Sequence, residues 1–193
     1  MKNSLIEGLT ERIDNASTMH SSVGVILPSN NYHDFTSAVF SFMKSKQSHP
    51  FIYITVTKPF HTIKKENTEI IDSLNVHFID CVSLSSGISF PDDLCYFLDS
   101  PSQLEKIILE TISFLHETKE KDQSFVIIDA LSSLSLFNDD LLVMEFFTHL
   151  INNLILIGAH SISLCIEEEM NDMMYKMLYI KNEKILKIKE SFI

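Results

Sequence analysis

Glycine is scarce in this chain, and its scarcity excludes several common functional motifs. The 193 residues contain only four glycines, where average usage of about 7% predicts roughly thirteen. A Walker phosphate loop needs two glycines five positions apart, a dinucleotide fingerprint needs three within six positions, and a nucleophile elbow needs two around a serine. The glycines lie far apart, at Gly8, Gly24, Gly87 and Gly158. All three motifs are therefore absent.

Cysteine is also rare, and its spacing does not form a metal framework. Cys81, Cys95 and Cys165 are an odd number, with no CxxC pair and no nearby histidine pair to complete a zinc site. The eight histidines include no pair four residues apart with a glutamate between. We therefore predict no metal site, and we expect buried free thiols in a reducing, cytoplasmic compartment.

Basic residues are outnumbered by acidic ones. The chain has 15 lysines and arginines against 26 aspartates and glutamates, a net charge of −11 at pH 7. This balance opposes any partner held mainly by phosphate contacts, so nucleic acid is an improbable ligand. The first sixteen residues lack the uninterrupted apolar run of a secretory signal. Polar residues such as Glu145 and His149 also interrupt the apolar stretch Leu141 to Ala159, so we expect no membrane insertion.

Strand and helix patterns alternate through the first half of the core. Short apolar or β-branched runs at Val23 to Leu27, Phe51 to Thr57 and Val76 to Asp80 indicate strands. Apolar residues recur at helical spacing after Phe35, and Pro59 suits the first turn of a second helix that extends to about Leu74. An N-terminal amphipathic helix is predicted over residues 1–20, ahead of a core at 21–193.

The second half continues the alternation. A small strand or a helical turn is expected near Leu94 to Leu98, followed by a helix that extends to about Glu117. The run Ser124 to Asp129 (SFVIID) is typical of a buried central strand. A long apolar helix from Asn138 to Gly158 and a strand at His160 to Ile166 come next.

The start of the helix before Glu117 carries a capping pattern. Ser100, Pro101 and Gln103 fit a capping box, in which the serine caps the helix, the proline takes its first position and the glutamine reaches back to the free amide. The sequence therefore predicts that this helix begins at Pro101.

The end of the chain is predicted to form an antiparallel ribbon. Two short apolar runs, Met177 to Ile180 and Ile185 to Ile188, are separated by the polar segment Lys181 to Lys184. Together with the alternating elements before it, this ribbon gives a single α/β domain over residues 1–193. Its central sheet is mainly parallel, with function expected at the carboxyl ends of the strands.

Asp129 is the strongest functional signal in the sequence. It ends a buried strand at the place where an aspartate meets a metal-bound phosphate in P-loop enzymes. The segment SFVIIDALSSL resembles the Walker B strand of KaiC-like ATPases of the RecA superfamily, and the order of the other elements agrees from about residue 20 to 190. This resemblance implies a RecA-like three-layer domain.

The segments that would bind nucleotide depart from the KaiC-like pattern. After the first strand, the segment Pro28 to Asp34 reads PSNNYHD, without the glycines, the lysine or the Ser/Thr pair of a phosphate loop. After the second strand, Thr57-Lys58-Pro59 stands where active KaiC-like enzymes carry catalytic glutamates, and a cation cannot act as a general base. The resemblance therefore implies a degenerate member that lacks the Walker A loop.

The remaining polar groups at the strand ends are candidates for a vestigial ligand site only. They are Ser29, Asn30, Asn31, Lys58 and Asp129. We predict no catalytic residue and no cofactor, and we expect Asp129 to cap the turn that leads into Leu131 to Leu134.

Two functions from different classes follow. The first is a pseudo-ATPase without catalysis that acts as a regulatory or scaffolding subunit, with a protein partner or further copies of itself. The second is a nucleotide or small-ligand sensor that binds at the strand ends. A receiver-type phosphotransfer domain is the rival within the α/β class, but Leu27-Pro28-Ser29 supplies no acidic pair for it.

Overall fold

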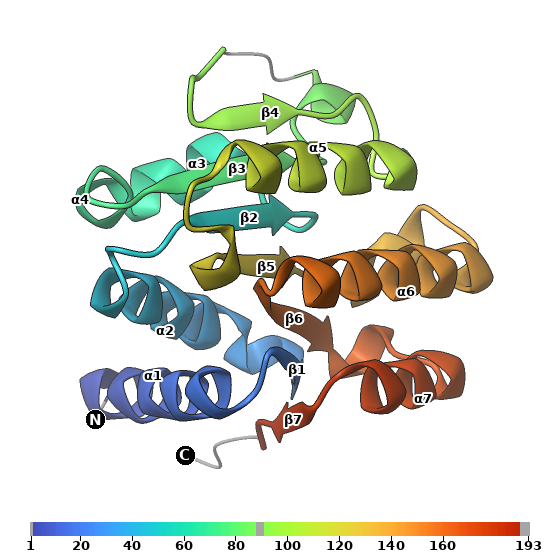
Figure 1. Cartoon of the computed structure of the whole chain (residues 1–193). Helices are drawn as coiled ribbons and strands as arrows, with labels where there is room; N and C mark the ends of the chain where they lie inside the picture. Colours follow the sequence, from blue (N-terminus) through green and yellow to red (C-terminus); the bar gives the residue numbers. More distant parts are fainter. Residues whose placement is uncertain (1, 88–90, 190–193) are drawn as a thin grey trace.

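The computed structural model of the chain describes residues 2–87 and 91–189 and shows a three-layer α/β arrangement (Figure 1). Met1, residues 88–90 and residues 190–193 of the predicted domain lie outside the described residues. In the described ranges a seven-stranded sheet has the order β4-β3-β2-β5-β6-β1-β7. The strands are β1 (Ser22–Leu27), β2 (Phe51–Thr55), β3 (Val76–Asp80), β4 (Cys95–Phe97), β5 (Phe125–Asp129), β6 (His160–Ile166) and β7 (Lys184–Lys187).

Helices cover both faces of this sheet and create two apolar cores. The helices are α1 (Lys2–Met19), α2 (Tyr32–Ser45), α3 (Phe60–Glu66), α4 (Thr68–Ile71), α5 (Leu104–Glu117), α6 (Asp140–Ile157) and α7 (Asp172–Lys181). Helices α1 to α4 contribute buried side chains to one core, and α5 to α7 contribute to the other. Every residue of β1, β2 and β5 is buried, as expected for apolar strands enclosed on both faces of a parallel sheet.

The predicted antiparallel C-terminal ribbon is wrong. Residues 177–180 belong to α7, and β7 pairs in parallel with β1, as every pairing between the seven strands is parallel. Met174, Met177 and Leu178 are buried on one face of α7, at helical spacing. A parallel neighbour cannot be reached through a tight hairpin, so the chain crosses over through this helix.

Two helix predictions also need correction. The helix predicted from Pro59 to about Leu74 is split into α3 and α4, with Asn67 between them in a non-helical conformation. Helix α5 begins at Leu104 rather than at Pro101. The Gln103 amide bonds to the carbonyl of Ser100 at 3.1 Å, which closes a separate turn, and Gln103 itself has φ −84° and ψ 57°.

Helix α6 is long and apolar enough to meet the length and composition of a membrane span. In this fold it packs on the sheet, with Val143, Phe147 and Leu150 fully buried. A third of the span is buried against the rest of the domain. The apolar character of α6 is therefore explained in part by its place in the core.

Candidate functional site

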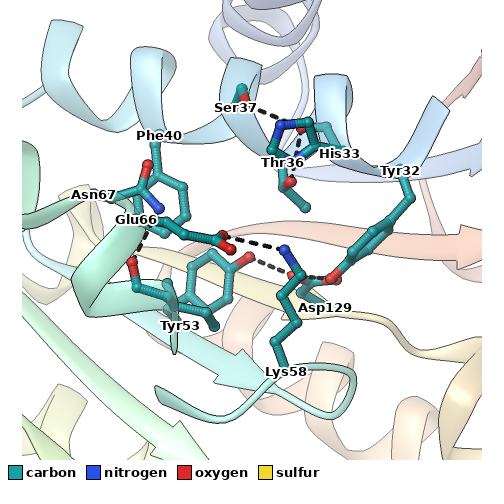
Figure 2. Close-up of a pocket in the computed structure, with 11 residues that line it drawn as sticks. Tyr32, His33, Thr36, Ser37, Phe40, Tyr53, Lys58, Glu66, Asn67 and Asp129 are labelled. Atoms are coloured by element: carbon teal, nitrogen blue, oxygen red, sulfur yellow. Dashed lines mark hydrogen bonds and ion pairs between the residues drawn. The ribbon is translucent and has the colours of Figure 1, made fainter. Parts of the chain in front are cut away.

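The carboxyl ends of β1, β2 and β5 lie along one edge of the sheet and carry the predicted site residues. Ser29, Asn30 and Asn31 form a 3-10 helix directly after β1 and lead into α2. Lys58 follows β2, and Asp129 is the last residue of β5. Because β2 is the neighbour of β5, Lys58 and Asp129 line the same cavity between α2 and α3 (Figure 2).

Asp129 is fully enclosed by hydroxyl groups. The Tyr53 hydroxyl donates to its Oδ2 at 2.5 Å, and the Tyr32 hydroxyl lies 2.8 Å from both carboxylate oxygens (Figure 2). Thr57 Oγ1 is 3.5 Å from Oδ1 and also hydrogen-bonds to the Tyr32 hydroxyl. Asp129 is only 1% exposed. Its carboxylate is thus bound by the chain itself.

The prediction that Asp129 caps the following turn is wrong. The 3-10 helix Ser132–Leu136 after β5 receives no side-chain cap from the described residues. Asp129 pairs in register with Thr55, and Tyr53 stands two residues before Thr55, so the side chains of Asp129 and Tyr53 point to the same face of the sheet. The carboxylate therefore meets the tyrosine rather than the backbone of its own turn.

Burial controls the protonation of this cluster. Burial raises the pKa of Asp129, although the tyrosine hydroxyls and the nearby Lys58 charge act in the opposite direction. Burial, and then the charge of Asp129, also raise the pKa of Tyr32 and of Tyr53 well above the usual tyrosine range. Both tyrosines keep their protons at neutral pH, so they remain hydrogen-bond donors to Asp129.

The loop after β1 is held by a carboxylate from the end of β6. The Ser29 amide and hydroxyl each donate to Glu168 at 3.0 Å. Partial burial acts against ionisation of Glu168, but these bonds lower its pKa below the usual range. A backbone amide at this edge, which could bind an external anion, is already satisfied by Glu168.

The other predicted site residues differ in their surroundings: one is ion-paired, one is buried and one is exposed. Lys58 Nζ forms an ion pair with Glu66 at 3.1 Å and lies 5.9 Å from the centre of the Tyr32 ring. Asn31 is buried, and its Oδ1 has no hydrogen-bond partner among residues 2–87 and 91–189. Asn30 is exposed at the rim. Of the five predicted residues, the structure brings Lys58 and Asp129 into one cavity, while Ser29 turns to Glu168.

The cavity between α2 and α3 is small and is lined by both polar and apolar side chains. Its volume is about 70 Å³, well below the roughly 300–1,000 Å³ of pockets that hold drug-sized ligands. Figure 2 shows Tyr32, Tyr53, Lys58, Glu66 and Asp129 around it. Within the described part of the chain, no group of three or more histidine, cysteine, aspartate or glutamate side chains could hold a metal ion.

Sequence reasoning missed the partners that close this site. Tyr32 stands directly after the SNN segment and Glu168 lies in an acidic turn, but neither position reveals its partner. The contact of Tyr32 with Asp129 spans 97 residues, and that of Glu168 with Ser29 spans 139 residues. Tyr53 resembles an ordinary aromatic core residue of β2. Only the periodicity of β2 and the expected pairing of two strands that end in Thr and Asp could have placed Tyr53 beside Asp129.

Comparison with known proteins supports the fold. No family model matches the sequence, and no curated protein does. The KaiC-like protein PH0186 from the hyperthermophilic archaeon Pyrococcus horikoshii OT3 superposes with a TM-score of 0.60 at 9% identity, over 88% of this chain and 72% of that one.

A second solved structure is similar to the same extent. The uncharacterized protein PH0321 from Pyrococcus horikoshii, crystallised in complex with an unknown peptide, has a TM-score of 0.64 at 10% identity and covers 89% of this chain and 78% of its own. At such identities the likeness concerns the fold alone. The chain therefore has a KaiC/RecA-like α/β fold.

Proposed function

We propose that this chain is a degenerate, non-catalytic KaiC-like domain that acts through protein contacts, as a regulatory or scaffolding subunit. The observation that carries the proposal is the hydrogen bonding of the Tyr32 hydroxyl to both carboxylate oxygens of Asp129, at 2.8 Å. A Walker B aspartate must be free to hold metal and its water ligands. Here the group is enclosed instead.

The other parts of a phosphoryl-transfer site are absent from the same edge. The loop after β1 contains no glycine or lysine, and its Ser29 amide is bound to Glu168. After β2, a lysine stands at the place of the catalytic base. This residue, Lys58, forms an ion pair with Glu66. Phosphoryl transfer depends on positioning and charge neutralisation, and the groups at this edge are engaged with one another.

Two observations favour contacts with proteins. Large apolar side chains are exposed on the helices of one face, including Leu109, Leu142 and Leu156, and exposed apolar groups that gather in patches mark interaction surfaces. PH0321, which shares the fold, was crystallised with a peptide. We extend that capacity to this chain as part of the proposal, together with a cytoplasmic location, which fits three free and buried cysteines.

The alternative is a sensor of nucleotide or another small ligand at the strand ends. The cavity beside Asp129 favours it, because Lys58, Tyr32 and Tyr53 line that space. A volume of about 70 Å³ suits a ligand no larger than a small inorganic ion. A nucleotide would have to displace Tyr32 from Asp129 before it could enter.

Phosphate release from ATP tests the main proposal. We expect the purified chain to release no phosphate above a no-protein control in the presence of Mg²⁺, and Asp129→Asn to leave this result unchanged. A thermal-shift series with ATP, ADP and cyclic dinucleotides separates the sensor, since ligand at 100 times its Kd stabilises by about 2.7 kcal/mol. Phosphate release that is lost specifically in Asp129→Asn would show that the domain is an enzyme.

The protein-contact part of the proposal needs its own measurement. Sedimentation velocity of the tagged chain, in extract from its native cell at native concentration, should show a species heavier than the monomer. A chain that sediments only as a free monomer there would contradict a scaffolding role, whatever the ATPase result.

A further inference from the structure

The face of the domain formed by α5 and α6 contains a groove separate from the Asp129 cluster. The two helices lie next to each other on the same side of the sheet (Figure 1), and the groove between them has a volume of about 490 Å³. Leu104 and Ile108 contribute from α5, and Leu142 and Phe146 contribute from α6. Leu142 is 48% exposed, whereas Phe146 at 3% forms the floor.

The length of the groove suits a short helix. From Leu142 to His149 the α6 wall spans eight residues, or roughly 10 Å at 1.5 Å per residue. Apolar positions one turn apart on each wall face a shared depression. This is the geometry in which an amphipathic helix places side chains at i, i+3, i+4 and i+7 between two helices.

The polar groups of the groove indicate the charge of its occupant. Glu105 and Glu145 line it from opposite helices, and neither makes an ion pair within the described residues. Lys106 also lines the groove, but its ammonium is 3.5 Å from Asp99. The chain contains no lysine or arginine between Lys121 and Lys176, the stretch that includes α6. His149 lines the groove as well. With histidine neutral, two carboxylates and one lysine give the lining a net negative charge around an apolar floor.

We propose that the α5–α6 groove binds a basic amphipathic helix of a partner protein. This inference rests on the proposed function, because both require a protein partner, but it assigns the surface and the partner's chemistry. Leucine-like side chains of the partner fill the depression at Leu142 and Phe146, while its lysines or arginines approach Glu105 and Glu145.

Charge separates this occupant from two others. A second copy related by a two-fold axis would bring the same net-negative patch of two chains together, and each chain has a net charge of −11. An anionic lipid surface would be repelled in the same way. A basic partner is attracted by both the groove and the whole domain, and the attraction weakens as salt is added.

Fluorescence anisotropy with designed peptides tests the proposal. The probe is a labelled helical peptide of about 18 residues with leucines at i, i+3, i+4 and i+7 and lysines elsewhere, and its partner probe has glutamate in place of each lysine. We expect the lysine probe to bind at least roughly tenfold more tightly than the glutamate probe, with Glu145→Lys weakening it roughly tenfold and Leu142→Asp more.

Matched variants keep the result specific to the groove. Glu117→Lys repeats the charge change of Glu145→Lys at an exposed position of α5 outside the groove. Leu156→Asp repeats the substitution of Leu142→Asp at an exposed leucine at the far end of α6. Both should bind the lysine probe as the unmodified chain does. Urea unfolding of every variant confirms that the fold is kept.

Several outcomes would overturn the proposal. These are no binding of the lysine probe at about 1 mM, equal binding of both probes, or equal losses in Glu117→Lys and Glu145→Lys. A dimer that Leu142→Asp abolishes would identify a second copy as the occupant instead, and co-sedimentation with phosphatidylserine vesicles would identify lipid. None of these outcomes decides the proposed function, because phosphate release and sedimentation test it without depending on the groove.

Discussion

Replacement of Tyr53 by phenylalanine tests the central feature of the site, the binding of Asp129 by the chain's own hydroxyls. The substitution removes one oxygen and leaves the ring, which stacks on Phe40 at 5.4 Å between centroids and contacts Phe78. The change therefore affects the hydrogen bond to Asp129 with little loss of packing. Tyr53 is only 1% exposed, so water cannot easily replace the lost donor.

The expected cost follows from the charge of the acceptor. Hydrogen bonds to charged groups contribute about 1.5–3 kcal/mol, so Tyr53→Phe should lower the free energy of unfolding by about 2 kcal/mol at pH values where Asp129 is ionised. For a chain of this size that loss lowers Tm by roughly 4–8 °C. Urea unfolding followed by circular dichroism measures the free energy directly.

The pH dependence provides a second test with a defined sign. Burial raises the pKa of folded Asp129 above its unfolded value of about 3.9. The folded state therefore binds the proton more tightly, and this residue's contribution to stability falls as pH rises between those two pKa values. The Tyr53 hydroxyl lowers the folded pKa, so its removal widens the interval. The cost of Tyr53→Phe should therefore grow as pH rises from the folded pKa of Asp129 in the unmodified chain to its higher folded pKa in the variant.

Tyr175→Phe is the matched control. Its hydroxyl donates to Glu167 at 3.0 Å near the surface, where water can take its place, so the expected cost is below about 0.5 kcal/mol. If Tyr53→Phe costs no more than Tyr175→Phe, or its cost stays constant as pH rises through the folded pKa of Asp129, then the hydroxyl does not stabilise a buried carboxylate and our account of the site is wrong.

Three further predictions concern the scaffold, each measured by urea unfolding. Gly24→Ala should lower the free energy of unfolding by about 1–3 kcal/mol, because the new Cβ would lie 2.7 Å from Ile185 Cδ1. Gly8→Ala on α1, where a Cβ would have nothing within 4 Å, should raise it by about 0.5–1 kcal/mol. The reverse order would contradict the packing of β1. Asn171→Ala should cost about 1 kcal/mol, since its side chain accepts the Met174 amide at 2.9 Å, and no loss would show that α7 does not need this cap. Asp80→Ala should cost about 3 kcal/mol or more, because it leaves two buried amides, one partly buried amide and a buried hydroxyl without an acceptor, and a loss below about 1 kcal/mol would exclude that role.

The sequence alone determined the elements whose patterns are local. The apolar run FVIID predicted a buried central strand, and β5 is that strand. The order of strands and helices predicted a parallel α/β sheet, since parallel neighbours need crossover helices. The same order placed Ser29, Lys58 and Asp129 at the carboxyl edge, because that end of every parallel strand lies on one side of the sheet.

The end of the chain could not be decided from local pattern. The run Met177 to Ile180 is short and apolar, and it fits a strand as well as a helix segment. The choice depends on β1, whose open side accepts β7 in parallel, and on the second core, which buries Met174 and Met177 on one helix face. Both are contacts with residues distant in the chain, so the tertiary structure settled the helix.

The chemistry of the candidate site was decided entirely by tertiary structure. Asp129 was evident in the sequence, but the groups that hold it, Tyr53 and Tyr32, are 76 and 97 residues away. Neither tyrosine differs locally from an aromatic core or loop residue. Whether a strand-end aspartate binds an external ligand or the chain's own hydroxyls depends on which side chains converge on it, and that convergence arises only when β2, β5 and α2 pack together.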